Sequence, residues 1–471
     1  MNDVTLATAS FEPGSTIDQF TLGERLHAGA MGVLFRVTGP QEGFPLVMKV
    51  PRLRSAESDE ALINFETEAM ILPELSGRHA PRFVAAGDLE RLPYIVTEWV
   101  EGECLEAIRG DQPMAPERVA AIGAAIADAL HALHQQDTIH FDLKPDNVIL
   151  RADGSVALID YGIAHHAGFP DLLAEEKRFA SGSAPYISPE QLLGQRDDTR
   201  SDIFALGVLL YELLTARLPF GIPATISGMK DRLWMDPEPP RARLTVTPAW
   251  LQEVILRCLE ANADERYQSA AHVAFDLRHP DQVPLTERAR RVERVGFVGQ
   301  AQRWWKLRNR ARAVRRLPRM QASRAPVIMV AVDTTHPDDE RHPFLQGATR
   351  QILSLSGEFR VVCVAVVKGG PEASSDGTGG PHYEHLVRLR HWVEPLKLPS
   401  ARLSLHVLEA AMPGQALVDY ALANHVDLIV VGAPKPSTQA MAWWRSVAST
   451  VTANAHCSVH VVRVPQRADD A

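Results

Sequence analysis

The chain has 471 residues, of which 45% are hydrophobic and 23% are charged, and it contains 30 glycines and 33 prolines. This length exceeds a single small domain, and this composition excludes fibrous and wholly disordered proteins. The formal net charge of −9 gives no reason to expect that the whole chain coats nucleic acid, so no nucleic-acid partner is expected.

The first folded segment follows a tail of residues 1–19 and is expected to span residues 20–278. Short runs typical of strands come first, and longer segments with helical periodicity follow. A small β-rich lobe should therefore precede a larger helical lobe. The strand-like runs are Phe20–Leu26, Val33–Val37, Leu46–Val50 and Tyr94–Trp99, and the helical segments include Pro116–His134 and Asp202–Thr215.

A basic linker is expected at residues 279–325. Residues 287–324 hold 13 Lys and Arg and only two acids, so the rest of the chain carries a net charge of −20. Apolar residues recur at helical spacing from Trp304 to Leu317, which predicts a basic amphipathic helix. Such a helix can lie on an anionic membrane surface, but no lipidation signal accompanies it. We favour a helical connector that docks on an acidic neighbouring domain.

The last segment, residues 326–471, alternates apolar runs with helical patterns. This alternation predicts an α/β domain with a doubly wound parallel sheet of five strands. The runs are VIMVAV, VVCVAVV, LSLHVL, DLIVVG and VHVVRV, and the helical patterns lie near Phe344–Leu355, His382–Val393, Gly414–Asn424 and Ala442–Ala455.

The cysteines and the chain start bear on the compartment. The four cysteines lie far apart and form no C-x-x-C pair, which argues against a zinc site, a redox centre and a disulfide scaffold. The first residues lack the basic and apolar regions of a signal peptide, and no segment offers the roughly 18 consecutive apolar residues of a membrane span. We therefore expect a cytoplasmic protein.

Two features near the start of the first domain suit a triphosphate. Gly29 and Gly32 stand between two strand-like runs and would let the backbone approach phosphates, although an ordinary turn explains such glycines more often. Lys49 lies in an otherwise apolar strand, where a buried ammonium needs a partner. Glu68, in a helical run, can supply the carboxylate.

Two acids and an amide follow later, at the ends of short apolar runs. Asp142 and Asn147 lie in the segment HFDLKPDN, and Asp160 lies in ALIDYG. Such groups suit metal binding and a hydroxyl acceptor. Phosphoryl transfer demands charge neutralisation by magnesium and in-line positioning rather than covalent chemistry from the protein.

In this order and at these separations, the motifs resemble a eukaryotic-like Ser/Thr protein kinase of the bacterial type. The resemblance implies a bilobal α+β fold that uses ATP and Mg²⁺, with Mn²⁺ as an alternative ion. It also implies that Gly29 and Gly32 cover the phosphates, and that Lys49 holds the α- and β-phosphates while paired with Glu68.

The same resemblance assigns roles in the second lobe. Asp142 matches the catalytic base, Lys144 contacts the transferring phosphate, and Asn147 and Asp160 match the magnesium ligands. Glu190 of the sequence SPE should pair with Arg266. The remaining residues expected to surround ATP are Leu26, Leu34, Val47, Glu98, Val100 and Ile149.

Asp202 matches the helix residue that braces the catalytic loop, and the loop itself departs from the family pattern. Phe141 replaces an arginine that normally pairs with a phosphorylated activation loop. We therefore hypothesise activity without obligatory activation-loop phosphorylation, and Ser181→Ala tests this more cleanly than Ser183→Ala, because Ser183 occupies an acceptor-site position. His27 replaces the first glycine of the phosphate loop, so ATP binding should be weakened but not abolished.

The last domain resembles the universal stress protein family, whose ATP-binding members carry G-x2-G-x9-G-[ST] after the fourth strand. Here the pattern falls on Gly432, Lys435, Arg445 and Ser446, so the two central glycines are missing. Asp333 stands where the family has an acid near the nucleotide. Because backbone amides approach phosphate less closely without those glycines, we favour a regulatory or dimerising domain over a nucleotide site.

The sequence thus favours a Ser/Thr protein kinase that transfers the γ-phosphate of Mg-ATP to protein hydroxyls. A homodimer through the last domain follows from the resemblance only. The alternatives are a pseudokinase or nucleotide-sensing scaffold in stress signalling, which His27 and Phe141 favour, and a small-molecule phosphotransferase. The complete set of charged motif residues opposes the first, and Lys144 and Asp202 oppose the second.

Overall fold

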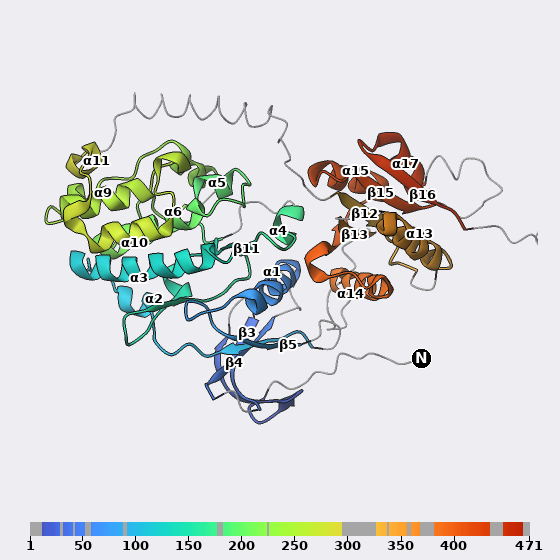
Figure 1. Cartoon of the computed structure of the whole chain (residues 1–471), viewed down its shortest axis with the longest axis horizontal. Coiled ribbons are helices and arrows are strands. Elements are labelled where there is room, and N and C mark those ends of the chain that lie inside the picture. The colour runs from blue at the N-terminus through green and yellow to red at the C-terminus, as the bar shows by residue number, and fades with distance from the viewer. Residues whose placement is uncertain are drawn as a thin grey trace, which may run out of the picture.

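The computed structural model describes most of the chain, and every structural statement below refers to that part. Figure 1 shows two folded units, an N-terminal domain described as far as residue 293 and a C-terminal domain described from residue 326. The described residues are 12–28, 32–40, 43–51, 58–87, 92–176, 182–223, 226–293, 326–336, 339–355, 359–367, 381–433 and 446–464.

The small lobe of the N-terminal domain is an antiparallel sheet with strand order β1-β2-β3-β4-β6-β5. Alternate residues such as Phe20, Leu22 and Met48 point into one buried cluster, as period-two patterning predicts. Helix α1 (Ser58–Ile71) packs beside β4. The strands are β1 (Thr16–Ile17), β2 (Phe20–Ala28), β3 (Gly32–Thr38), β4 (Leu46–Pro51), β5 (Phe83–Ala86) and β6 (Ile95–Glu98).

The large lobe is helical and is built around α6 (Arg200–Thr215), which is buried along almost its whole length. A helix that is apolar all round belongs in a core, and α3 (Pro116–His134) and α9 (Ala249–Cys258) both pack on it. The other elements are β7 (Glu103–Cys104), α2 (Leu105–Arg109), β8 (Thr138–Ile139), β9 (Val148–Leu150), β10 (Val156–Leu158), β11 (His165–His166), α4 (Leu172–Glu175), α5 (Pro189–Leu192), α7 (Ile226–Met229), α8 (Pro240–Arg243), α10 (Ala270–Arg278) and α11 (Glu287–Arg290).

The start of the expected basic linker packs on this lobe. Arg288, in α11, donates to Glu253 at 3.1 Å and to Glu260 at 2.8 Å, and Arg291 donates to Asp236 at 3.0 Å. These basic residues therefore dock on acids of the neighbouring domain. The predicted amphipathic helix lies outside the described residues.

The C-terminal domain is a parallel sheet of five strands with order β14-β13-β12-β15-β16, which confirms the predicted doubly wound fold. Helices α13 and α14 cover one face, and α15 and α17 cover the other (Figure 1). The elements are β12 (Val327–Ala331), α13 (Arg341–Leu355), β13 (Arg360–Val367), α14 (Pro381–Val393), β14 (Leu403–Glu409), α15 (Pro413–Ala423), β15 (Leu428–Gly432), α17 (Val447–Asn454) and β16 (Ser458–Val462).

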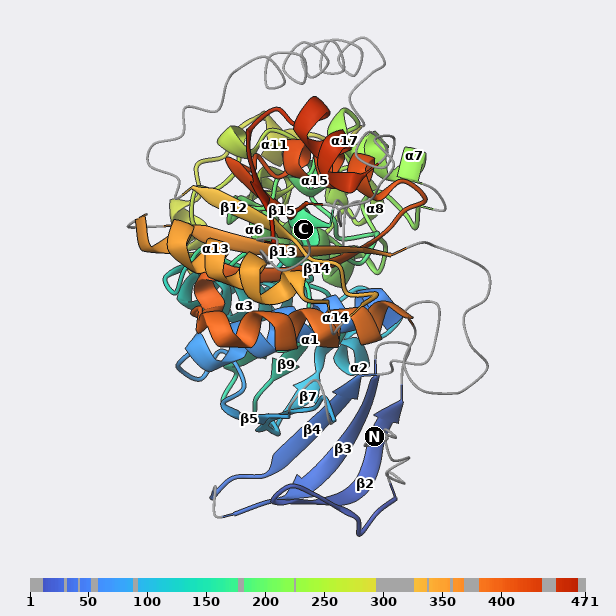
Figure 2. The same cartoon turned by 90° about the vertical axis from the view of Figure 1, so that its right-hand side faces the viewer.

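The C-terminal domain lies against the side of the N-terminal domain that carries α1 and α4. Figure 2 shows α14 next to α1, and Figure 1 shows α4 next to β13. Across the described part of the chain, no helix combines the length and apolar character needed to cross a membrane.

Candidate active site

Three charged side chains meet where the two lobes join. Lys49 lies on β4, Glu68 on α1, and Asp160 follows β10. The Lys49 ammonium donates to Glu68 Oε2 at 2.6 Å and to Asp160 Oδ1 at 2.8 Å. Burial disfavours this ammonium, but the two carboxylates outweigh burial and raise the pKa of Lys49. The ammonium in turn lowers the pKa of Asp160 to about 2, so both groups are charged at neutral pH.

The Asp142 carboxylate is the centre of a second group of contacts. Lys144 Nζ donates to its Oδ2 at 2.8 Å, and Asn147 Nδ2 donates to the same oxygen at 3.0 Å. On the other side, the backbone N–H and the hydroxyl of Ser183 donate to Oδ1 at 3.0 and 2.9 Å. Asp142 therefore already binds one hydroxyl and one ammonium at the same time.

Buried Asp202, on α6, holds the backbone that carries Asp142. Its carboxylate accepts the N–H groups of His140 at 3.0 Å and Phe141 at 2.9 Å, and it lies 2.9 Å from His134 Nε2. Phe141 has a left-handed backbone with φ of 62°, a conformation that costs a bulky residue roughly 1–3 kcal/mol. The hydrogen bonds that the Asp202 carboxylate accepts from His140 and Phe141 help to hold this strained conformation.

Asn147 and Asp160 offer donors that suit a magnesium ion. The amide nitrogen of Asn147 donates to the backbone oxygen of Asp142 at 2.8 Å, which leaves its oxygen to act as a ligand. Amide and carboxylate oxygens are ligands that Mg²⁺ prefers, usually completed by phosphate oxygens and water. Within the described ranges, no cluster of three His, Cys, Asp or Glu could hold a metal alone. Asn147 and Asp160 would supply two of the oxygens that such an ion needs.

Gly32 lies where β3 and β4 approach closely. A Cβ atom there would lie 2.6 Å from the carbonyl oxygen of Val50, so a larger residue would force the strands apart. Gly29 lies outside the described residues. Val100, which follows β6, is buried. The other expected ATP contacts are all half-buried, namely Leu26, Leu34, Val47, Glu98 and Ile149.

Phe141, in the position of the missing arginine, is buried in an apolar cluster. The cluster joins it to Ile63 of α1 and to Leu172 and Leu173 of α4. The guanidinium of Arg196 lies over the Phe141 ring, 4.6 Å from its centre. Nothing in the sequence marks Arg196, because a lone arginine in a loop belongs to no motif.

The predicted ion pair below the active site is present. Arg266 donates to both carboxylate oxygens of Glu190, at 2.6 and 2.8 Å, and both side chains are buried. Such bidentate pairs are strong and geometrically specific. Arg266 also donates to three backbone oxygens around it.

The candidate motif of the C-terminal domain is only partly described, because Lys435 and Arg445 lie outside the described residues. Gly432 ends β15, and a Cβ atom there would touch nothing within 4 Å, so packing does not require glycine. Ser446 caps α17 by accepting the N–H of Ser449 at 3.1 Å. Asp333 accepts from Thr335 and, at 3.4 Å, from Arg341.

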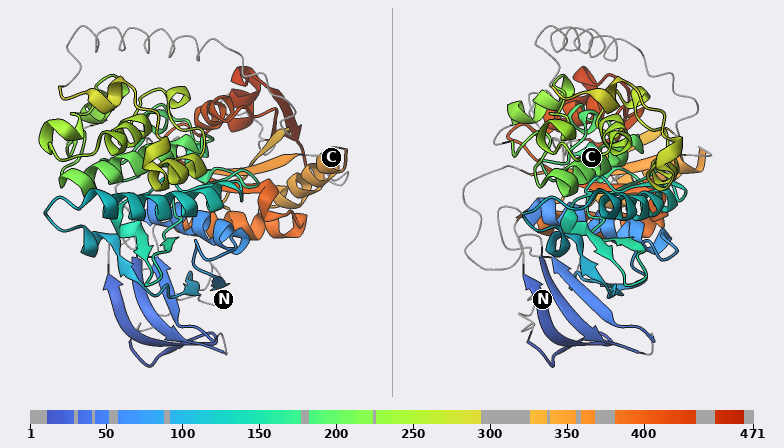
Figure 3. Two further views of the ribbon diagram at one scale, coloured as in Figure 1. Left: turned by 60° about the vertical axis from the view of Figure 1, so that its left-hand side comes forward. Right: turned by 90° about the vertical axis from the view of Figure 1, so that its left-hand side faces the viewer.

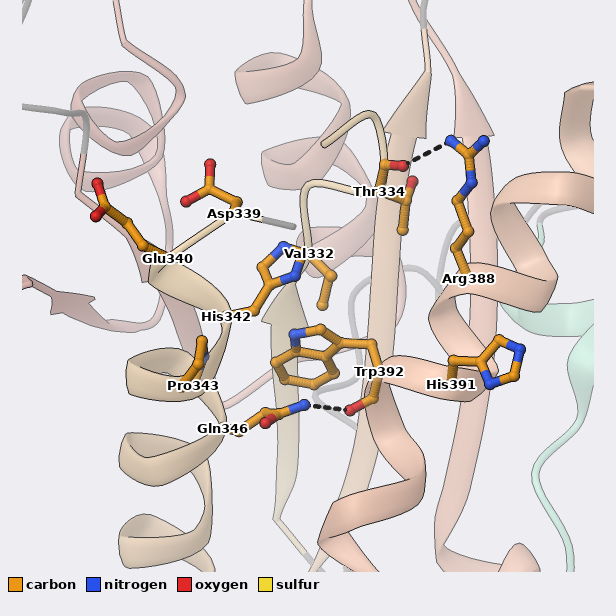
Figure 4. Close-up of a pocket in the computed structure, with 10 residues that line it drawn as sticks. All are labelled: Val332, Thr334, Asp339, Glu340, His342, Pro343, Gln346, Arg388, His391 and Trp392. Carbon is orange, nitrogen blue, oxygen red and sulfur yellow. Dashed lines mark hydrogen bonds between the residues drawn. The ribbon is translucent and has the colours of Figure 1, made fainter. Parts of the chain in front are cut away.

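A cavity of about 470 Å³ lies between α13 and α14 of the same domain (Figure 4). Arg388 donates to the carbonyl oxygen of Thr334 at 2.9 Å on one side, and Gln346 donates to that of Trp392 at 2.7 Å. The buried indole N–H of Trp392 has no acceptor among the described residues. No sequence motif indicated this cavity, since its lining comes from separate helices.

Two family models match the chain. The model described as protein kinase domain covers residues 20–276, and the model described as universal stress protein family covers residues 312–463. The two matches agree with the bilobal N-terminal domain and the five-stranded parallel C-terminal domain.

Several curated proteins are similar to part of the chain. The serine/threonine-protein kinase PknB of Mycobacterium tuberculosis is 33% identical over 270 residues, which are 56% of this chain and 43% of that protein. PknB of Mycolicibacterium smegmatis is 34% identical over 280 residues, 58% of this chain and 45% of that protein. A probable serine/threonine-protein kinase of Streptomyces coelicolor is 31% identical over 275 residues, which are 56% of this chain and 40% of that protein. The chain thus spans less than half the length of these relatives.

Proposed function

The chain belongs to the protein kinase family, and from that premise we propose that it is an active Ser/Thr protein kinase that transfers the γ-phosphate of ATP to Ser and Thr hydroxyls of proteins. The observation that carries the proposal is the pair of contacts at Asp142. Its carboxylate binds the Ser183 hydroxyl at 2.9 Å and the Lys144 ammonium at 2.8 Å. A substrate hydroxyl bound in the same way would have an acceptor for its proton and a cation beside the phosphate that it attacks.

The roles of the remaining residues follow from their charges. Lys49, held by Glu68, would bind phosphate oxygens of ATP, and Asn147 and Asp160 would hold the magnesium ion. That ion supplies positive charge against the phosphate oxygens when bound. Asp142 would orient the acceptor hydroxyl and take its proton as the new oxygen–phosphorus bond forms and the bond to the leaving ADP oxygen breaks.

The pseudokinase and nucleotide-sensing alternative accounts for less of the geometry. A scaffold that only binds nucleotide has no use for a carboxylate that binds a hydroxyl and an ammonium together. His27 and Phe141 depart from the usual pattern, but the carboxylate of Asp142 is bound by Lys144, Asn147 and Ser183. We therefore keep weaker ATP binding as the proposed effect of His27.

We also propose protein substrates, a cytoplasmic location and a C-terminal domain that regulates the kinase or pairs two chains. All four cysteines are free thiols, which suits a reducing compartment. The sheet of the C-terminal domain ends in β14 and β16, and an edge strand can pair with a second copy. The proposed segments are those expected from the sequence, with the kinase at residues 20–278 and a linker at residues 279–325.

Transfer of radiolabelled phosphate from ATP to a generic protein substrate tests the function. We expect Asp142→Ala to lower the rate at least about a hundredfold, the usual contribution of a general base. Asp146→Ala is the matched control, because Asp146 is an exposed acid of the same loop, and it should keep the wild-type rate. Equal incorporation by wild type and Asp142→Ala would refute the catalytic proposal.

A further inference from the structure

The C-terminal domain contacts the two elements of the kinase domain on which the active site depends. Figure 3 shows it lying along the face that carries α1. Arg390, on α14, donates to Glu66 Oε1 on α1 at 2.8 Å. Glu66 and Glu68 are two positions apart and therefore point to different sides of the helix. One carboxylate of α1 thus faces the C-terminal domain while the other holds Lys49.

The second contact is made by α4, the short helix that follows the Asp160 segment. Its last residue, Glu175, is buried against the C-terminal domain. Arg360 of β13 donates to one of its carboxylate oxygens, and His406 Nε2 of β14 lies 2.7 Å from the other. Tyr420 donates to the same oxygen at 3.5 Å, and Asn424 donates to the backbone oxygen of Glu175 at 3.2 Å.

The charges in this cluster are complementary. Burial alone would lower the pKa of His406, but hydrogen bonds to Glu175 and Glu176 raise it to about 9. Burial alone would raise the pKa of Glu175, but His406 and then Arg360 lower it to about 2. A buried charge without its partner is strongly unfavourable, so each group requires the other domain.

The other end of α4 is tied to the catalytic loop. Asp171 caps the helix by accepting the N–H of Ala174 at 3.1 Å, and Arg196 donates to its carboxylate at 2.8 Å. Arg196 also stacks on Phe141, whose ring packs with α4 and α1. The apolar cluster around Phe141 and the ion pair between Arg196 and Asp171 therefore link the catalytic loop to α4. In the resembling kinases, an arginine in the place of Phe141 would pair with a phosphate instead.

The candidate site is assembled in the same structure in which the C-terminal domain contacts both α1 and α4. Lys49 lies 2.6 Å from Glu68, the Ser183 hydroxyl lies 2.9 Å from Asp142, and the rings of His140 and Tyr161 are 5.1 Å apart. The contacts that hold α1 and α4 thus coincide with an assembled catalytic site.

We propose that the C-terminal domain is an intramolecular activator, in which Arg390, Arg360 and His406 are positioning residues that hold α1 and α4 in the catalytic arrangement. This inference rests on the proposed kinase activity. The surface formed by β13, β14, α14 and α15 binds one partner, the α1–α4 face of the same chain.

Charge reversal at the partly exposed pair tests the proposal. In the full chain, Arg390→Glu and Glu66→Arg should each lower kcat about fivefold, because each places like charges across the interface. The double variant restores opposite charges and should return most of the activity. Arg350→Glu is the matched control, since Arg350 is exposed on α13 and its guanidinium donates to the carbonyl oxygen of Pro395 in its own domain.

Glu175→Gln supplies a second variant at the buried cluster. It keeps the size of the side chain and removes its charge, so kcat should fall about tenfold or more while the KM for the protein substrate changes little. Phosphatase treatment of the wild type should leave kcat unchanged. A kcat that rises in the single variants, or a loss on phosphatase treatment, would overturn the proposal.

Hydrogen exchange measured on the same proteins separates this inference from the proposed function. Amides of α1 and α4 should exchange faster in Arg390→Glu and recover in the double variant, whether or not phosphate transfer is detected. Unchanged exchange together with unchanged kcat would refute the activator role alone. Absence of transfer by the wild type would refute the kinase activity, while the exchange result still decides whether the domains hold one another.

Discussion

Glu190 and Arg266 form a buried ion pair whose loss should be measurable as a large drop in stability. Glu190→Gln keeps the shape of the side chain but leaves the Arg266 guanidinium, which has 0% exposed side-chain surface, without its counter-charge. Removing one partner of a buried pair costs about 3–5 kcal/mol. For a domain of roughly 250 residues, each kcal/mol shifts the unfolding midpoint by roughly 2–4 °C. The expected fall in Tm is therefore roughly 6–20 °C.

Thermal unfolding followed by circular dichroism measures this shift. The matched control is Asp128→Asn, which breaks the pair between Asp128 and Arg278, whose side chains are 41% and 48% exposed. Exposed pairs contribute at most about 1 kcal/mol, so the control should shift Tm by less than roughly 4 °C. A double change of Glu190 and Arg266 should cost less than the sum of the two single changes, because the pair is coupled.

Equal shifts of Tm in Glu190→Gln and Asp128→Asn would refute the large cost expected for breaking the buried pair. Such a result would mean that water or a backbone oxygen neutralises Arg266 as well as the carboxylate does. The three backbone oxygens that Arg266 already contacts make this the most direct competing explanation.

Three further predictions follow from the structure. Gly32→Ala should raise the KM for ATP several-fold with little loss of folding at 25 °C, because its Cβ would press on the Val50 carbonyl oxygen; an unchanged KM in steady-state kinetics would contradict this. Asp202→Asn should lower kcat at least about tenfold without changing the KM for ATP, since it loosens the catalytic loop. Charged His406, whose usual pKa is 6.5, should contribute its full stability below about pH 6.5 and lose it as the pH rises through 9. Ionised Glu175 should lose its contribution as the pH falls from about 4.5 through 2. The Tm difference between wild type and His406→Gln should therefore shrink from pH 6 to pH 9.

Long periodic segments could be predicted from the sequence because one face of each is buried. Helix α3 spans Pro116–His134 as expected, and the five alternating strands of the C-terminal domain form the expected parallel sheet. The ion pair between Glu190 and Arg266 could also be predicted, since both residues belong to motifs. Each of these features leaves a local or ordered pattern in the chain.

The features that could not be predicted are contacts between residues that lie far apart in the chain and belong to no motif or periodic segment. Helix α4 has only four residues, too few for periodicity to reveal. Glu175 and His406 lie 231 positions apart, and neither stands in a motif. The contact of Arg196 with the ring of Phe141 could likewise not be predicted, because the two residues are far apart in the chain. The candidate site residues could therefore be named from the sequence, whereas the contacts between α4 and the C-terminal domain could not.

Because Glu175 of α4 is buried against the C-terminal domain, its partners become available only later in synthesis of the chain. A ribosome completes α4 long before it makes His406, because 231 positions separate Glu175 from His406. At about 5–20 residues per second, this stretch takes roughly 12–46 s to make. During that interval the finished kinase lobes have no partner for Glu66 or Glu175. On the proposed role of the C-terminal domain, the kinase domain of a nascent or truncated chain has low activity, which rises only once the C-terminal domain has been made and has docked.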